Sequence, residues 1–224
     1  MNNTAHTTGA TNTTNAQALA RLKERIQQEL DCPLKHAATN LVFGKGNPDA
    51  DIIFIGEAPG EQEDKAGEPF VGRAGKELDK LLHSIGLSLR DIYIANILKY
   101  RPPNNRDPTL EEIQRHTPYL IEQILIIKPT IIATLGNFAT KFFLANQNPH
   151  HMRRVSGISA LHGKPRHTTI NGRHFIIFPL YHPASMLYKP PLRATLEEDF
   201  QRLRRLITAE RAAQSTQQSL TNYS

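Results

Sequence analysis

The sequence predicts an α/β protein with a parallel sheet covered by helices on both faces. Four short apolar runs have the length and composition of buried strands, and amphipathic stretches separate them. Strands that alternate with helices in this way favour a parallel sheet with helices packed on each face. The expected strands are DIIFI (51–55), DIYIANI (91–97), TIIATLG (130–136) and HFIIFPL (174–180).

Apolar residues at helical spacing predict the helices. Residues 15–30 place leucines and an isoleucine on one face, and a second stripe over 78–85 ends at Gly86. Thr109 and Glu112 have the spacing of a capping box, which opens a helix to about residue 128. Further helices are expected from residue 137 and over 193–213.

Composition shifts mark the ends of a single folded domain. Residues 1–14 are rich in Thr and Asn, so we expect a disordered tail there. The predicted domain covers 15–211, and a polar Ser- and Gln-rich tail follows over 212–224. Within the domain, 101–108 contains three prolines and must be a loop, and 156–173 is a long polar connection with room for a small hairpin.

The overall charge indicates the class of partner. A net charge of +6 and a pI of about 9.5 favour a polyanion such as nucleic acid. No apolar run approaches the ~20 residues of a membrane span, and no secretory signal is recognisable at the start. A single cysteine, Cys32, excludes an internal disulfide and indicates a reducing compartment. We expect a cytoplasmic monomer without membrane association.

Unusual polar residues follow every predicted strand. GEAPG comes after the first strand, Asn96 lies near the end of the second, Gly136 and Asn137 follow the third, and YHPAS follows the fourth. Ligands of parallel sheets bind outside the carboxyl ends of the strands, which all lie at one edge. The sequence therefore predicts an active site at that edge.

The loops at this edge carry two features with more than one interpretation. Gly56 and Gly60 permit a sharp exit from the strand, and such a turn presents N–H groups to an anion or a carbonyl oxygen. The alternative is an ordinary strand-to-helix turn. Phe70, between Pro69 and Gly72 in a polar loop, either stacks on a base or pins the loop to the sheet.

Two polar residues suit the recognition of a base. Asn96 has apolar neighbours, and a buried amide must satisfy both its oxygen and its N–H groups. One acceptor beside one donor matches the N3–H and O4 edge of uracil, whereas cytosine presents the opposite pattern. The alternative is an Asn that caps the strand end. His182 precedes Pro183, which fixes the backbone after the ring.

The segment after His182 has features of a DNA-binding loop. Ser185, Met186 and Leu187 stand between prolines, as in a stiff loop whose apolar wedge unstacks a duplex. Basic residues here and in the 101–106 loop are candidates for phosphate contacts, with solvated surface charge as the alternative. They are Arg101, Arg106, Lys189 and Arg193.

Four motifs in matching order resemble the uracil-DNA glycosylase superfamily, and most closely its family-four members. They are GEAPGEQED, GEPFVGRAG, NILKYRPPNNRDP and YHPASML, and the similarity covers about residues 31 to 207. The resemblance implies a three-layer α/β/α sandwich around a four-stranded parallel sheet. It also implies excision of uracil from DNA by base flipping, which initiates base excision repair.

The resemblance further implies roles for individual residues. Phe70 matches the ring that stacks on uracil, Asn96 the amide that reads its edge, and His182 the histidine that hydrogen-bonds O2. Glu57 and Glu63 match acidic positions of the first motif. Either is a candidate to orient the attacking water, and Glu63 is alternatively placed to exclude a thymine methyl. Further contacts to the base are expected in the first motif, at Gly56, Ala58, Pro59 and Gly60.

One departure from the family pattern concerns a cofactor. Family-four members hold a [4Fe–4S] cluster on four cysteines, and this chain has Glu29, Cys32, Tyr100 and His116 at those positions. One thiol is insufficient for such a cluster, so we expect no iron–sulfur cluster and no metal. Packing, with Tyr100 as filler, is the expected replacement; zinc bound by Glu29, Cys32 and His116 is the alternative.

The predicted reaction is hydrolysis of the N-glycosidic bond of deoxyuridine in DNA. The base leaves as an anion while the sugar gains oxocarbenium character, and a neutral His182 donates to O2 of the leaving base. Two other functions fit the same residues. One is a glycosylase for deaminated purines such as hypoxanthine or xanthine, and the other is a catalytically silent protein that binds DNA lesions.

Overall fold

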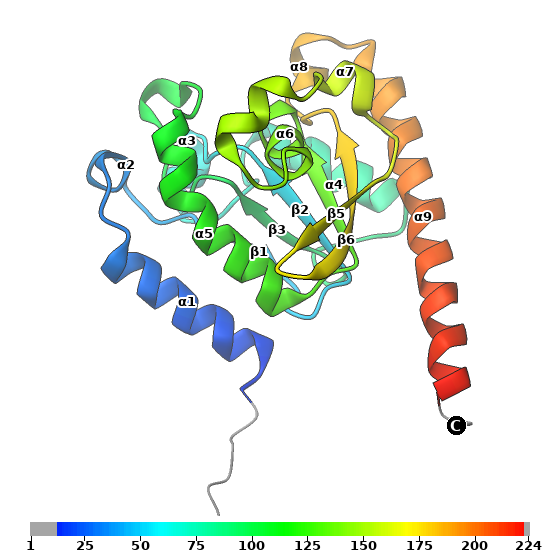
Figure 1. Cartoon of the computed structure of the whole chain (residues 1–224). Helices are drawn as coiled ribbons and strands as arrows, with labels where there is room; N and C mark the ends of the chain where they lie inside the picture. Colours follow the sequence, from blue (N-terminus) through cyan, green and yellow to red (C-terminus); the bar gives the residue numbers. More distant parts are fainter. Residues whose placement is uncertain (1–12, 222–224) are drawn as a thin grey trace, which may run out of the picture.

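The structure, a computed structural model, describes residues 13–221 (Figure 1). At its centre lies one six-stranded sheet with the strand order β1-β3-β2-β4-β6-β5. The strands are β1 (Lys45–Gly46), β2 (Ile52–Gly56), β3 (Tyr93–Asn96), β4 (Ile131–Leu135), β5 (Arg166–Ile170) and β6 (Arg173–Leu180). Residues 1–12 of the expected N-terminal tail lie outside the described residues.

The centre of the sheet is parallel, and its edges are not. β3, β2, β4 and β6 are parallel neighbours, and these are the four strands expected from the apolar runs. β1 and β5 add antiparallel edges, so the sheet has six strands rather than four. Neither edge forms an apolar run, because β1 has two residues and β5 is the polar RHTTI. Asn171 and Gly172 close the β5–β6 hairpin with φ angles of 47° and 78°, as a two-residue turn requires.

Helices cover both faces of the sheet and complete three layers. One face carries a core formed with α1, α5 and α6, and the other carries a core formed with α4 and α9. In Figure 1, α1 and α5 lie on the left and α9 runs down the right side. These helices are α1 (Asn15–Glu29), α4 (Arg73–Ser84), α5 (Leu110–Ile127), α6 (Asn137–Leu144) and α9 (Leu192–Thr221).

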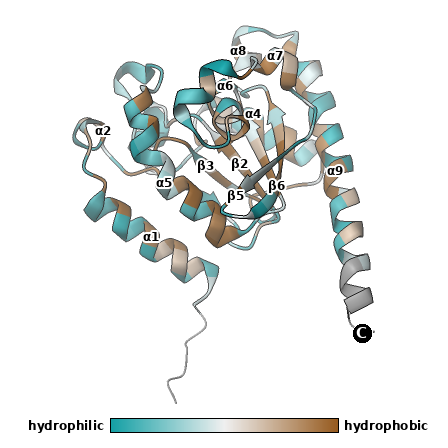
Figure 2. Ribbon diagram, in the orientation of Figure 1, coloured by the Kyte–Doolittle hydropathy of each residue, from teal (hydrophilic) through white to brown (hydrophobic). Residues whose placement is uncertain are grey.

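The central strands supply side chains to both cores. Along β2, Ile53 and Ile55 join the core under α1 and α5, whereas Ile52 and Phe54 join the core under α4 and α9. Figure 2 shows the central strands mostly in brown, between helices in which teal and brown residues are mixed. A strand buried on both faces is continuously apolar, which is why the sequence marks the central strands so clearly.

The connections contain six short helices. They are α2 (Pro33–Ala37), α3 (Glu61–Ala66), η1 (Pro103–Asn105), η2 (Pro149–Arg154), α7 (Ile158–Leu161) and α8 (Ser185–Tyr188). The capping box expected at Thr109 and Glu112 is present at the start of α5, with both reciprocal hydrogen bonds. α9 continues to Thr221, into the segment expected to be a polar tail. None of the helices in residues 13–221 combines the length and apolar character needed to cross a bilayer.

Candidate active site

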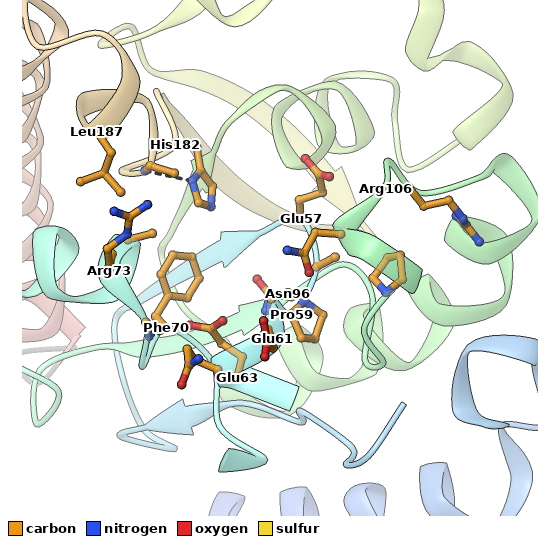
Figure 3. A pocket seen from close by; sticks show the side chains of 18 of the residues that line it. Glu57, Pro59, Glu61, Glu63, Phe70, Arg73, Asn96, Arg106, His182 and Leu187 are labelled. Carbon is orange, nitrogen blue, oxygen red and sulfur yellow. Dashed lines mark hydrogen bonds between the residues drawn. The ribbon is translucent and has the colours of Figure 1, made fainter. Parts of the chain in front are cut away.

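A cavity of about 570 Å³ opens where the parallel strands end, and we call it the strand-end cavity. Glu57 follows β2, Asn96 ends β3 and His182 follows β6, and all three line the cavity with Phe70 from the loop before α4. Figure 3 shows these side chains around one hollow. The structure thus brings together residues that lie up to 125 positions apart in the printed sequence.

Gly56 leaves space rather than a special backbone angle. Neither Gly56 nor Gly60 has a positive φ, so the expected need for glycine flexibility in the turn is wrong. A Cβ atom at Gly56 would lie 2.4 Å from Asn96 Oδ1 and 2.9 Å from Phe70 Cζ. A Cβ at Gly60 would lie 2.8 Å from Glu63 Oε2. Gly56 is not among the residues that line the cavity, but the absence of a side chain there lets Asn96 and Phe70, which do line it, keep their positions.

Phe70 is held in an unfavourable backbone conformation beside His182. Its φ of 53° is left-handed, which costs a non-glycine residue about 1–2 kcal/mol. The two rings are stacked, with centroids 5.7 Å apart and 29° between their planes. Phe70 is 8% exposed and packs into the α4 and α9 core, so it both pins its loop and offers a ring to the cavity.

Glu63 fixes the loop that carries Phe70. Its Oε1 accepts hydrogen bonds from the backbone N–H groups of Val71, at 3.0 Å, and Gly72, at 2.8 Å. These two groups directly follow Phe70 in the chain. The carboxylate on α3 thereby stabilises the strained position of the ring.

Asn96 presents an unpaired acceptor to the cavity. The residue is 2% exposed, and among the described residues its Oδ1 is one of two buried side-chain atoms without a hydrogen-bond partner. The other is Ser185 Oγ. An unsatisfied buried polar atom costs about 1–3 kcal/mol, so such an atom calls for an explanation, and a ligand that donates to it is one.

His182 is a neutral hydrogen-bond donor. The backbone N–H of Ala184 donates to Nδ1 at 3.2 Å, which leaves the proton of a neutral ring on Nε2. Burial lowers the pKa of His182 to about 4, and the charge of Glu63 only partly opposes this effect. Gly136, directly after β4, lies close to His182, because a Cβ there would be 3.2 Å from His182 Cβ and 3.9 Å from the ring atom Cδ2. At neutral pH, His182 is therefore uncharged and its Nε2–H is available as a donor in the cavity.

Glu57 brings to the cavity a carboxyl group whose pKa is raised. Burial raises its pKa to about 7, with a further contribution from the negative charge of Asp107. Within residues 13–221, no hydrogen bond or ion pair involves its carboxylate. A carboxyl group poised near neutral pH suits proton transfer.

The basic residues expected to contact DNA are mostly engaged within the protein. Arg106 lines the cavity but forms a two-pronged ion pair with Glu112 at the start of α5. Arg193 pairs with Glu77 at 2.7 Å. In the described part of the chain, Arg101 donates to Asn105, and Lys189 is exposed without a recorded partner.

The α8 segment divides its side chains between the core and the cavity. Met186, expected among the DNA contacts, is 4% exposed and packs in the α4 and α9 core instead. Leu187 and Tyr188 line the cavity. Arg73, the first residue of α4, also lines it and is exposed. Tyr188 and Arg73 were not singled out from the sequence, although Arg73 lies within the motif GEPFVGRAG and Tyr188 directly follows YHPASML.

The four positions at which family-four members have cysteines do not form a cluster site in this chain. Glu29 faces solvent and pairs with Arg25 at 3.4 Å. His116 uses both ring nitrogens, because Nδ1 accepts from the Lys99 backbone N–H at 2.9 Å and Nε2 lies 3.5 Å from Cys32 Sγ. Tyr100 is buried and packs edge-on against the His116 ring. Elsewhere in residues 13–221, too, no three His, Cys, Asp or Glu side chains are grouped to hold a metal ion.

A buried lysine connects this region to the cavity. Lys99 is fully buried, and its ammonium donates to the backbone oxygen of Asn96 at 2.9 Å and to Gln123 Oε1 at 2.5 Å. Burial lowers its pKa to about 7. We call Cys32, Lys99, Tyr100, His116 and Gln123 the His116 lobe. Its hydrogen bonds end on the residue whose side chain forms the cavity wall.

Comparison with known proteins agrees with this geometry. The family model described as "Uracil DNA glycosylase superfamily" matches residues 43–205. The chain is 45% identical over 196 residues to a type-4 uracil-DNA glycosylase of Sulfurisphaera tokodaii, covering 87% of each protein. It is 46% identical over 187 residues to that of Archaeoglobus fulgidus, covering 84% of this chain and 92% of the relative. For the Thermotoga maritima enzyme, identity is 40% over 199 residues, covering 88% and 98%.

The matched region includes every element that lines the strand-end cavity, from the end of β2 to α8. The family model spans well over half of the chain, and the relatives match it over most of their own lengths. On this evidence, the chain belongs to the uracil-DNA glycosylase superfamily.

Proposed function

We propose that this protein is a uracil-DNA glycosylase that flips deoxyuridine out of DNA and hydrolyses its N-glycosidic bond. The observation that carries the proposal is the unpaired Asn96 Oδ1 in a cavity shared with the Phe70 ring and the His182 N–H. A pyrimidine with one ring N–H between two carbonyl oxygens complements these groups. The type-4 uracil-DNA glycosylases similar to this chain support the same activity.

Recognition of the base follows from the hydrogen-bonding pattern. Asn96 Oδ1 accepts the N3–H of uracil, and the amide N–H of Asn96 donates to O4. Cytosine has no proton on N3 and carries an amino group at C4, so it leaves both amide groups unpaired. Phe70 stacks on the face of the base. A site built to pair with a polar edge rejects ligands without that edge strongly.

Bond cleavage depends on stabilising the departing base. The C1′–N1 bond breaks, its electron pair stays on the base, and negative charge develops at O2. His182 Nε2–H is aimed into the cavity as a preorganised donor for that oxygen. Because the ring is neutral, it stabilises the charge by a hydrogen bond and keeps its own proton.

Glu57 rather than Glu63 is the residue we assign to the attacking water. Glu63 already accepts two backbone N–H groups, so its role is to position the Phe70 loop. Glu57 is free of such partners among the described residues. As a carboxylate it orients the water, opposes the positive charge on the sugar and takes up the proton when the oxygen bonds to C1′.

We also infer that this chain folds and acts without an iron–sulfur cluster. One thiol is present among the four relevant positions, and its neighbour His116 has both nitrogens engaged. Zinc is disfavoured as well, because the His116 nitrogens are engaged and Glu29 points to solvent. The steps above use the chain's own side chains. We further propose that the protein is a monomer and that it acts on uracil-containing DNA in the cytoplasm.

The deciding experiment is release of uracil from a single-stranded oligonucleotide, followed by alkaline scission of the abasic product. We expect cleavage at deoxyuridine and little at hypoxanthine or xanthine. Preferential cleavage at a purine would replace uracil as the substrate. Binding without scission would indicate a silent lesion-binding protein.

The matched variants for that assay are His182→Ala and His167→Ala. Loss of the donor in His182→Ala should lower the excision rate about 100- to 1,000-fold, as for other oxyanion donors. His167 is exposed on the edge strand β5 and does not line the cavity, so its replacement should leave the excision rate unchanged. Equal rates for the two variants would remove His182 from the mechanism.

A further inference from the structure

We propose that the Tyr188 ring is a stacking platform for a DNA base that borders the site of nucleotide extrusion. The inference rests on the proposed function, because it concerns the duplex from which the uracil is removed. It adds a DNA-positioning contact outside the base-binding part of the cavity. The chemical class that the ring recognises is a nucleobase face.

The exposure of Tyr188 is unusual for the described part of the chain. Its relative exposure is 76%, whereas the other exposed large apolar residues there, Leu89 and Leu110, are at 39% and 41%. A single exposed aromatic is not by itself a site. Tyr188, however, lines the strand-end cavity together with Leu187, six residues after His182 in the chain.

The ring is mounted on a stiff segment. Met186 anchors α8 in the core, and Pro190 and Pro191 follow the helix. The backbone N–H of Ser185 bonds to the oxygen of His182 at 2.8 Å, and that of Lys189 bonds to the oxygen of Ser185 at 2.8 Å. A ring held on such a segment loses little freedom when a base stacks on it.

The surroundings of Tyr188 suit a nucleic acid better than an apolar partner. Lys189 is next in the chain and exposed, and Arg73 lies in the wall of the same cavity. Neither cation has an ion pair recorded in residues 13–221, in contrast to Arg106 and Arg193. An aromatic face beside free cations is the combination that tracks bases and phosphates.

The position of Leu187 separates two tasks on one helix. Leu187 is half-buried and lines the cavity. Tyr188 lies one residue further on and projects into solvent. On this basis Leu187 fills the space close to the cavity, and Tyr188 stacks on a base that stays in the duplex.

The test uses 2-aminopurine, whose fluorescence falls when it stacks, in duplexes that carry 2′-fluorinated deoxyuridine, which resists cleavage. The probe is placed 5′ of the uracil, 3′ of it, or opposite it. At one of these positions, the saturated complex of Tyr188→Ala should be brighter than that of the wild type. Tyr188→Phe keeps the ring and should match the wild type.

Affinity provides the second readout. Tyr188→Ala should bind the duplex about tenfold more weakly, as expected for loss of one stacking contact, and Tyr188→Phe should bind normally. Leu89→Ala is the matched control, since Leu89 is exposed and precedes β3, whereas Asn96 lies at the other end of that strand. It should change neither fluorescence nor affinity.

Two results would overturn the inference, and they are distinguishable. If the wild type excises uracil but the Tyr188→Ala complex has unchanged fluorescence at all three positions, Tyr188 does not stack and the proposed function stands. If the wild type releases no uracil from any duplex or single strand, the proposed function fails and the inference fails with it.

Discussion

The strand-end cavity and the His116 lobe differ in whether their buried polar groups have hydrogen-bond partners. In the lobe, both nitrogens of His116 are engaged and the Lys99 ammonium reaches two close acceptors. In the cavity, Asn96 Oδ1 is buried without a hydrogen-bond partner, and burial raises the pKa of Glu57 to about 7. Buried polar groups are normally paired, so the unpaired ones mark where a ligand is expected. The cavity is arranged for binding, and the lobe for folding.

The largest expected effect tests the cavity side of this comparison. Asn96→Ala should lower uracil excision about 100-fold, because two hydrogen bonds to the base are lost. The free energy of unfolding should change by less than ~1 kcal/mol, since the change also removes an unpaired buried oxygen. Single-turnover excision and urea unfolding measure the two quantities. A stable variant with a normal excision rate would contradict the assignment of Asn96.

The opposite result is expected in the lobe. His116→Phe leaves the Lys99 backbone N–H without its acceptor, which should lower the free energy of unfolding by about 1–3 kcal/mol. Excision per folded molecule should persist, because His116 does not line the cavity. His36→Phe, at an exposed position of α2, should cost less than ~0.5 kcal/mol. If His116→Phe were stable but inactive, the division of roles between the regions would be lost.

A smaller effect is expected from pH. Burial raises the pKa of Glu57 to about 7, so the carboxylate form that the mechanism needs is lost as pH falls through that value. The excision rate should rise about tenfold from pH 6 to pH 8 and then level off. His182 stays neutral over this range, because its pKa is about 4.

Two variants sharpen the pH experiment. Glu57→Gln should give a low rate that no longer depends on pH. Glu61→Gln, in the same cavity but with its carboxylate paired to Lys65, should keep the wild-type profile. If the excision rate of Glu57→Gln still rose with pH, a group other than Glu57 would be responsible for the pH dependence.

The smallest expected effect is that of metal removal. Protein purified from an iron-supplied culture should lack the visible absorption of an iron–sulfur cluster and contain iron far below four atoms per chain. Treatment with a chelator should change neither stability nor excision. Stoichiometric iron, or unfolding in the chelator, would show that the lobe holds a metal after all.

The sequence could predict those parts of the fold that depend on local residue patterns. The central strands are apolar throughout because both faces are buried, and Thr109 with Glu112 marks the start of α5 without any tertiary information. The edge strands leave no such pattern. β1 has two residues, and β5 pairs only because its turn directs it back along β6.

For the site, the sequence could name residues but not their partners. Asn96 and His182 follow from their places at strand ends, and Phe70 follows from its place between Pro69 and Gly72 in a polar loop. The hydrogen bonds of Glu63 to Val71 and Gly72 depend on how α3 meets a loop, and the ion pair of Arg106 with Glu112 depends on how a loop folds back on its helix. Likewise, only the three-dimensional course of α8 shows that Met186 points inward and Tyr188 outward.

The crowding around Gly56 makes this position genetically fragile. Every missense change in its codon adds at least one carbon atom, which would lie 2.4 Å from Asn96 Oδ1 and 2.9 Å from Phe70 Cζ. Such an allele would displace Asn96 or Phe70, the two side chains that the proposed function assigns to the base. Its signature would be a rising frequency of C-to-T transitions from unrepaired cytosine deamination.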